Sequence, residues 1–161
     1  MEAIVAVYSD WGIGGGGTQP LVLRADRARF STMTKGSTVI VGRRTLLDFP
    51  GGRPLPHRRN IVVTTNREFS VEGADIAHSK AEALALLGEG ERCFVIGGAN
   101  VFMQFFSALD TIYVTKIEAE PVSDSYFPNL DKNPDWRCTE QGDWQEEAGV
   151  SFCFCTYRRI R

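Results

Sequence analysis

One stretch decides the fold class of this chain: Thr38-Val39-Ile40-Val41-Gly42-Arg43-Arg44-Thr45. Its first four residues are all β-branched, which predicts a strand buried on both faces. Gly42 lets a backbone approach a phosphate, and a helix that begins after it adds N–H donors and positive potential. Ligands of open α/β sheets bind beyond the carboxyl ends of the strands, so this junction is a candidate phosphate site. A solvated basic turn is the alternative interpretation.

Similar apolar runs at residues 3–8, 60–64, 93–96 and 112–117 predict further buried strands. Helical stretches at residues 25–34, 79–87 and 100–108 alternate with them, which is typical of a largely parallel sheet. Residues 136–143 and 150–158 face each other across residues 146–149. We therefore expect one α/β domain over residues 1–161, with a mostly parallel central sheet, helices on both faces and a C-terminal antiparallel hairpin.

The composition is that of an ordinary globular protein: 161 residues, 43% hydrophobic and 24% charged, with a formal net charge of -2. This charge offers no basic field for nucleic acid. No apolar run approaches a membrane span, and the N-terminus lacks the basic flank of a signal peptide, so a cytoplasmic location is expected. The four cysteines form no CxxC pair, and we expect them to be reduced and structural.

Two other junctions follow predicted strands. Thr64-Thr65-Asn66-Arg67 offers hydroxyls and a guanidinium that could complete a site for a phosphate. Gly97-Gly98-Ala99-Asn100 joins a strand to a helix through a glycine pair, which suits the close approach of a pyrophosphate. A tight turn without a ligand also explains this second junction.

An acidic residue stands on the apolar side of a predicted helix. At 100° per residue, Asp26 lies in the stripe made by Leu23, Phe30 and Met33. Because burial raises the pKa of a carboxyl, Asp26 is a candidate proton donor or a clamp for a cationic ligand. A first-turn aspartate that stabilises the helix dipole is the alternative.

Residues 10–20 are rich in glycine and apolar at their edges, which predicts a mobile lid. A lid, a basic turn, a glycine pair and a buried acid together favour a reaction from which water is excluded. Hydride transfer to a substrate is that kind of chemistry.

Several motifs, taken in order, resemble the dihydrofolate reductase family along nearly the whole chain. They are Ile4-Val5-Ala6, Trp11-Gly12-Ile13-Gly14, Ala25-Asp26 with Phe30, Val41-Gly42-Arg43-Arg44-Thr45, Arg53-Pro54-Leu55-Pro56, Ile96-Gly97-Gly98, Tyr113-Val114-Thr115-Lys116-Ile117 and Asp124-Ser125-Tyr126-Phe127-Pro128. The resemblance implies reduction of dihydrofolate by NADPH, with hydride delivered to pterin C6 and a proton to N5. It also implies a cis peptide bond between Gly97 and Gly98.

The resemblance further implies a role for each matching position. Asp26 would grip the amino-pyrimidine edge of the pterin with support from Thr115, and Arg58 would hold the glutamate α-carboxylate. Other substrate contacts would come from Ile4, Val5, Phe30, Phe49, Leu55 and Ile96. Arg43, Arg44, Thr45 and Thr65 would surround the 2′-phosphate of NADPH, and Ser125 would help to close the lid. Further cofactor contacts would come from Ala6, Ile13, Gly42, Thr64, His78, Gly97, Gly98, Ala99, Asn100, Val101, Phe102 and Gln104.

Three positions depart from the common family pattern. Leu21 stands where a tryptophan usually follows the proline of the lid, which makes it a candidate catalytic position through its effect on water near Asp26. Asn100 replaces a frequent arginine, and Phe102 replaces a frequent tyrosine.

Two other functions remain open at this point. A riboflavin-pathway reductase shares the scaffold more distantly, although Asp26 with Arg58 argues against it. A folate or nucleotide binder with little turnover would be consistent with Leu21. Dihydrofolate and antifolate inhibitors are the expected ligands, no metal is expected, and the protein is expected to be a monomer.

Overall fold

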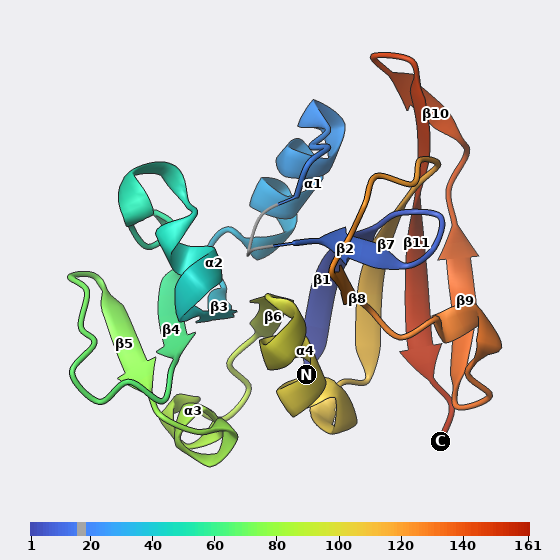
Figure 1. Cartoon of the computed structure of the whole chain (residues 1–161). Helices are drawn as coiled ribbons and strands as arrows, with labels where there is room; N and C mark the ends of the chain where they lie inside the picture. The colour runs from blue at the N-terminus through green and yellow to red at the C-terminus, as the bar shows by residue number, and fades with distance from the viewer. Residues whose placement is uncertain (16–18) are drawn as a thin grey trace.

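The computed structural model describes residues 1–15 and 19–161, and within them nine strands form one sheet (Figure 1). The main path runs β10-β11-β7-β1-β6-β3-β4-β5, and β9 pairs with β11. The bounds are β1 Glu2–Val7, β3 Thr38–Gly42, β4 Arg59–Val63, β5 Ala74–Ala77, β6 Cys93–Gly97, β7 Thr111–Ile117, β9 Trp136–Gln141, β10 Gln145–Glu147 and β11 Val150–Arg159. A separate pair joins β2 (Gly12–Gly14) to β8 (Ser125–Tyr126).

The strands from β7 to β5 on this path are parallel, and β11 pairs antiparallel with β7, β9 and β10. The predicted fold class is therefore confirmed. The helices are α1 Arg24–Thr34, α2 Arg43–Leu47, α3 Lys80–Leu86 and α4 Ala99–Phe105, with 3₁₀ turns at Pro50–Gly52, Phe106–Ala108 and Leu130–Lys132. The predicted helix over residues 100–108 thus ends earlier and continues as a 3₁₀ turn.

The C-terminal hairpin differs from its prediction. Glu147 pairs with Val150, so the turn contains only Ala148 and Gly149, both with positive φ (52° and 80°). A two-residue turn of this kind matches the twist of the strands that it joins. β10 is therefore the hairpin partner of β11, and β9 pairs with β11 on both sides of a break in register between Thr156 and Tyr157.

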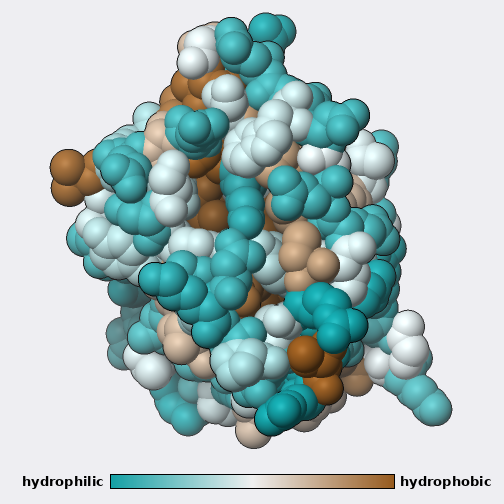
Figure 2. All heavy atoms as spheres, turned by 90° about the vertical axis from the view of Figure 1, so that its right-hand side faces the viewer, coloured by the Kyte–Doolittle hydropathy of each residue, from teal (hydrophilic) through white to brown (hydrophobic). Residues whose placement is uncertain are grey.

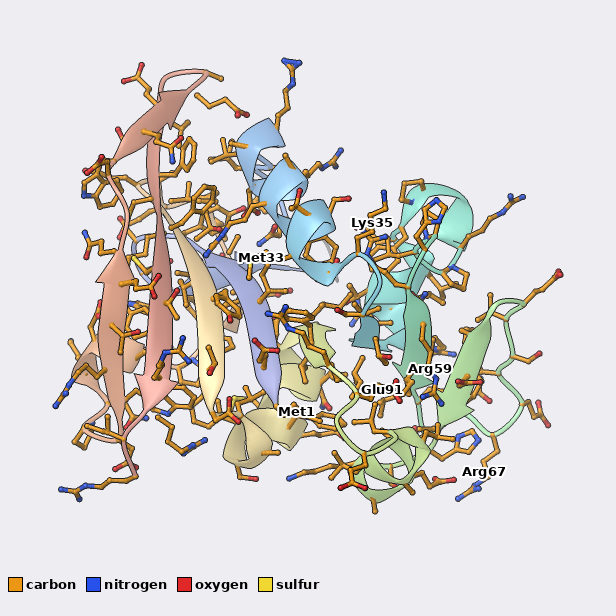
Figure 3. The ribbon with its side chains drawn as sticks, turned by 180° about the vertical axis from the view of Figure 1, so that it is seen from behind. Met1, Met33, Lys35, Arg59, Arg67 and Glu91 are labelled. Carbon is orange, nitrogen blue, oxygen red and sulfur yellow. The ribbon has the colours of Figure 1, made fainter. Side chains whose placement is uncertain are left out.

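Alternate residues of the central strands pack against different helices. On one face, Ile4, Val39 and Phe94 pack with residues of α1, and Val41 and Val62 pack with Leu46 of α2. On the other face, the largest cluster joins strand residues such as Val95 and Val114 to Ala83 of α3 and to Val101, Phe102 and Phe105 of α4. The helices thus cover both faces, and Figure 3 shows the molecule from behind with α1 over the sheet.

The outer strands carry the polar surface. Buried and exposed residues alternate little along β9 and β10, and most residues of both strands after Trp136 are exposed. Hydrophilic residues cover much of the side on which these strands lie (Figure 2). No helix within residues 1–15 and 19–161 is long and apolar enough to cross a membrane.

The packing of the core predicts which substitutions lower the free energy of unfolding. Phe94 is 0% exposed and packs with Ile4 and Val39, so Phe94→Ala should lower the free energy of unfolding by about 3–5 kcal/mol. Val122 is 95% exposed, and Val122→Ala should change the free energy by no more than about 0.5 kcal/mol. Urea unfolding of both variants measures this difference. Equal effects would contradict the core described above.

Candidate active site

The first turn of α1 is held in place by a residue from the distant hairpin. Leu23 at the N-cap offers no side-chain cap, and the carboxylate of Glu147 instead accepts bonds from the backbone nitrogens of Arg24 (2.6 Å) and Ala25 (3.0 Å). These bonds lower the pKa of the Glu147 carboxyl. A carboxylate is favoured at this position by the positive end of the helix dipole. The tip of the β10–β11 hairpin therefore fixes where α1 begins.

Asp26 also lies in the first turn of α1, and its side chain faces the sheet. The hydroxyl of Thr115, fully buried on β7, donates to Asp26 Oδ1 at 2.6 Å. Burial raises the pKa of the Asp26 carboxyl above its ordinary value, and the Thr115 bond and the charge of Arg29 oppose this effect only in part. The prediction that Asp26 points to the core is confirmed, and the site holds a carboxyl that binds a proton more tightly than an exposed aspartate does.

The apolar residues predicted to line a substrate cleft gather beside Asp26. Ile4 lies in one cluster with the half-buried side chains of Phe30, Leu55 and Ile96. Phe49 belongs to the adjoining cluster, and Ile96 contacts both. Val5 is different, because its side chain packs on the opposite face of the sheet. Val5 can therefore reach the cleft only through its backbone.

Arg58 is held rigidly at the rim of this region. Its Nε donates to Thr34 Oγ1 (2.8 Å), Nη1 to the Pro56 carbonyl (2.5 Å), and Nη2 to the Ser31 hydroxyl (3.1 Å). The guanidinium carbon lies 6.0 Å from the centre of the Phe30 ring. Residues of α1 and of the segment before β4 thus hold this charge next to the apolar cluster that contains Phe30.

The carboxyl ends of β3 and β6 meet at a corner that excludes side chains. Val41 pairs with Gly97, and the Gly97-Gly98 peptide bond is cis, as predicted. A Cβ on Gly42 would lie 3.0 Å from Val101 Cγ2, and a Cβ on Gly98 would lie 3.1 Å from Thr45 Oγ1. Backbone atoms of the glycines therefore border this corner. The Gly97-Gly98 pair, which the sequence predicts to approach a pyrophosphate, lies there beside Gly42.

The predicted residues for the 2′-phosphate follow β3 and β4, which are neighbours in the sheet. Arg43 is half-buried, whereas Arg44 and Thr65 are exposed. Thr64 is nearly buried, and its carbonyl lies 2.8 Å from the Nδ1 atom of His78. The guanidiniums and hydroxyls thus have access to solvent at one edge, where an anion can reach them.

The remaining predicted cofactor residues lie along α4, β1 and β2. Asn100 and Gln104 are exposed and hydrogen-bonded to each other, whereas Phe102 is buried 5.1 Å from the ring of Phe127. Ala6 is buried on the α1 face, and Ala99 is half-buried at the start of α4. Ile13 packs against the main cluster from β2.

The predicted lid is tied to the segment before Phe127. Gly14 pairs with Ser125, and the Gly14 nitrogen donates to the Ser123 hydroxyl at 3.2 Å. A Cβ on Gly12 would lie only 2.5 Å from that hydroxyl oxygen, so the close approach requires glycine. Of the predicted lid, residues 16–18 lie outside the described residues.

The far end of the lid is fixed by a residue that the sequence analysis did not single out. The buried hydroxyl of Tyr8 bonds both to the carbonyl of Leu21 (3.1 Å) and to its nitrogen (3.2 Å), and Gln19 donates to the Ala6 carbonyl (3.2 Å). Tyr8 is the last residue of the strand predicted over residues 3–8, and its partner Leu21 lies 13 residues further along the chain, so no local signal pointed to this contact. Leu21 itself packs with Tyr8 and Leu23.

A cavity of about 400 Å³ lies at the opposite, amino-terminal edge of the parallel strands. The charged groups in and beside it form ion pairs: the Met1 ammonium with Asp110, Arg92 with Glu2, and Arg59 with Glu91, each at 2.9 Å. Figure 3 labels Met1, Arg59 and Glu91 at this edge. These charges compensate one another at the amino-terminal edge, far from Asp26. The carboxyl edge with Asp26 therefore remains the candidate site.

The chain matches the family model described as dihydrofolate reductase over residues 1–159. It belongs to the dihydrofolate reductase family. The Bacillus subtilis dihydrofolate reductase is 36% identical over 149 residues, covering 91% of this chain and 87% of that protein. The Staphylococcus haemolyticus enzyme is 34% identical over 163 residues, covering 100% and 96%. A solved structure of Enterococcus faecalis dihydrofolate reductase complexed with NADP(H) and RAB-propyl shares 32% identity and a TM-score of 0.88, covering 99% and 96%.

The side chains at the carboxyl edge suit an organic cofactor and substrate, as in the dihydrofolate reductase family. Within residues 1–15 and 19–161, no cluster of three His, Cys, Asp or Glu side chains could hold a metal ion. The groups that meet at the carboxyl edge are instead one half-buried carboxyl, a backbone-lined corner and several guanidiniums.

The bond from Thr115 predicts how Asp26 titrates. Thr115→Val keeps the shape but removes the donor, so the pKa of the Asp26 carboxyl should rise further. A ¹³C NMR titration of the aspartate carboxyls measures this change. Thr156→Val is the control, because Thr156 is equally buried on the neighbouring strand β11 and its hydroxyl makes no bond to Asp26. An unchanged Asp26 titration in Thr115→Val would contradict this account.

Proposed function

We propose that this protein reduces 7,8-dihydrofolate to 5,6,7,8-tetrahydrofolate with NADPH and so supports one-carbon and thymidylate metabolism. The observation that carries the proposal is the half-buried Asp26 carboxyl, bonded to Thr115 beside an apolar cluster. This arrangement occurs in a chain of the dihydrofolate reductase family.

Asp26 orients the pterin. A carboxylate accepts two parallel hydrogen bonds, and the amino-pyrimidine edge of the pterin offers a ring nitrogen and an amino group side by side. Thr115 fixes the rotation of the carboxyl, because its donor engages one oxygen. Ile4, Phe30 and Ile96 pack against the flat ring, and Phe49 and Leu55 extend this apolar surface toward Arg58. Arg58 is placed to bind the glutamate carboxylate of the substrate.

The carboxyl edge fits a dinucleotide cofactor. Gly42, Gly97 and Gly98 leave backbone at the corner between β3 and β6, where a side chain would block a pyrophosphate. Arg43, Arg44, Thr45 and Thr65 lie beside it and can bind the 2′-phosphate of NADPH. When bound, NADPH supplies the hydride that pterin C6 accepts. In this proposal, Ala6, Ile13, Ala99 and Phe102 lie near the nicotinamide half.

Asp26 also supplies the proton for pterin N5, through a water molecule or the substrate's tautomer rather than by direct contact. Its raised pKa keeps the carboxyl protonated at higher pH than an exposed aspartate, which brings its proton affinity closer to neutral pH. Leu21, held at its backbone by Tyr8, covers this region with an apolar side chain and limits the entry of water. Water exclusion strengthens the hydrogen bonds inside the site.

Replacing the acid tests the proposal. Asp26→Asn is nearly isosteric but cannot release a proton, so turnover near neutral pH should fall by at least about 10²-fold, the low end for a lost general acid. Activity should recover as the pH falls, because substrate protonated in solution does not need the acid. Turnover is followed by NADPH oxidation in both proteins across the pH range.

NADPH affinity is the control in this experiment and should stay nearly unchanged. If Asp26 only stabilised the first turn of α1, the amide would cost at most about 1 kcal/mol of stability and the pH profile would be kept. Near-normal turnover of Asp26→Asn at neutral pH would therefore overturn the catalytic role.

The two arginines after β3 should decide the choice of cofactor. Charge-assisted bonds to the 2′-phosphate are each worth about 1.5–3 kcal/mol, so the double variant Arg43→Ala, Arg44→Ala should lose most of its preference for NADPH over NADH. The ratio of kcat/KM for the two cofactors measures this preference. The double variant Arg27→Ala, Arg137→Ala removes the same charge from exposed positions elsewhere and should keep the ratio. An unchanged ratio in the first variant would place the phosphate elsewhere.

A further inference from the structure

Arg29 lies three residues after Asp26 on α1, and residues at this spacing are neighbours on a helix surface. Its side chain turns toward the C-terminal strands rather than to solvent. The guanidinium carbon lies 4.4 Å from the ring centre of Phe154 on β11 and 5.9 Å from that of Tyr113 on β7. Phe154 pairs with Thr115, the donor to Asp26. Arg29 therefore packs over β11 and over β7, the strand that carries Thr115, on the side of the sheet where Thr115 meets Asp26.

One nitrogen of this guanidinium has an unusual environment. Arg29 Nη1 is buried and has no hydrogen-bond partner within residues 1–15 and 19–161. Burial lowers the pKa of the Arg29 guanidinium, but an arginine stays protonated in proteins. A buried cation is costly unless an opposite charge lies near it. The aromatic faces of Phe154 and Tyr113 compensate only part of that cost.

Few charged groups on the neighbouring strands can compensate for the remaining cost of burying the Arg29 charge. On β7, burial raises the pKa of Tyr113, whose neutral hydroxyl donates to Glu2 at 2.9 Å. On β11, burial raises the pKa of Cys155 to about 12, so the thiol is neutral. Glu140 on β9 carries a charge, but its side chain is exposed and water screens it.

The titratable groups around Asp26 also leave Arg29 and Asp26 as neighbouring opposite charges. On β1, burial raises the pKa of Tyr8, and its hydroxyl stays neutral. Glu147 on β10 is charged, but it is engaged with the backbone at the start of α1. Asp26 is therefore the half-buried carboxyl that Arg29 can stabilise, and each charge favours the ionised form of the other.

We propose that Arg29 is a positioning residue for the reduction, whose fixed positive charge near Asp26 sets the pH range in which Asp26 exchanges its proton with the substrate. This inference rests on the proposed function for its effect on turnover. Its effect on Asp26 itself does not depend on which substrate binds. The sequence pattern contained the signal, because Arg29 follows the acid at helical spacing on the buried side.

The test compares Arg29→Met, which removes the charge, with Arg29→Lys, which keeps it. Arg27→Met is the matched control, since Arg27 lies on the same helix but is exposed. In Arg29→Met, Asp26 should titrate at higher pH by ¹³C NMR, and the fall of turnover with rising pH should move in the same direction. Arg29→Lys and Arg27→Met should follow the unaltered protein in both measurements, and NADPH affinity should change in none of them.

Two results would overturn the inference: an Asp26 titration that is the same in Arg29→Met and Arg27→Met, or one that Arg29→Lys shifts as much as Arg29→Met. Either would mean that Arg29 acts by packing alone. If Arg29→Met does not fold, Arg29→Gln replaces it in the same comparison. Should the unaltered protein fail to oxidise NADPH with dihydrofolate, the proposed function fails, while the NMR titrations still decide the effect of Arg29 on Asp26.

Discussion

The hydrogen bond from Thr115 to Asp26 joins positions 89 residues apart in the sequence and ties helix α1 to strand β7. It places a carboxyl where water is scarce, which raises the proton affinity of the acid, and it offers a donor that makes this burial tolerable. These two effects oppose each other. Together they leave Asp26 with a raised pKa and with a carboxyl whose orientation is fixed by a hydrogen bond.

This bond can form only if α1 sits at one position on the sheet, and two distant segments ensure that it does. Glu147 caps the helix from the β10–β11 hairpin, and Tyr8 holds the chain just before the helix at Leu21. The parallel order of β1, β6, β3 and β4 then brings the glycine corner and the basic residues to the same edge. The positions of the acid, the apolar cluster and the glycine corner thus follow from one sheet topology.

Local signals predicted the parts of the structure that depend on local chemistry. The β-branched run at residues 38–41, the helix that presents Asp26 and the glycine pair at Gly97 all lie where the sequence indicated. The sequence did not predict the short edge strand β5 or the pair β2–β8, because Asp75 and the glycines of β2 interrupt any apolar run. The contacts of Glu147, Tyr8 and Arg29 were not predicted for another reason. Glu147 and Tyr8 bind partners far away in the chain, and Arg29 packs on a residue of β11.

Another reductase on the same scaffold would share the sheet and the cofactor corner but would need a different group opposite the substrate. The pairing of a half-buried Asp26 with Arg58 at the rim suits a molecule with a pterin at one end and a carboxylate at the other. The most direct measurement is therefore the oxidation of NADPH by the purified protein, with dihydrofolate and with a ribosylaminopyrimidine as separate substrates. We expect rapid oxidation with dihydrofolate and none with the ribosylaminopyrimidine. Oxidation with only the latter, or with neither, would mean that the protein is not a dihydrofolate reductase.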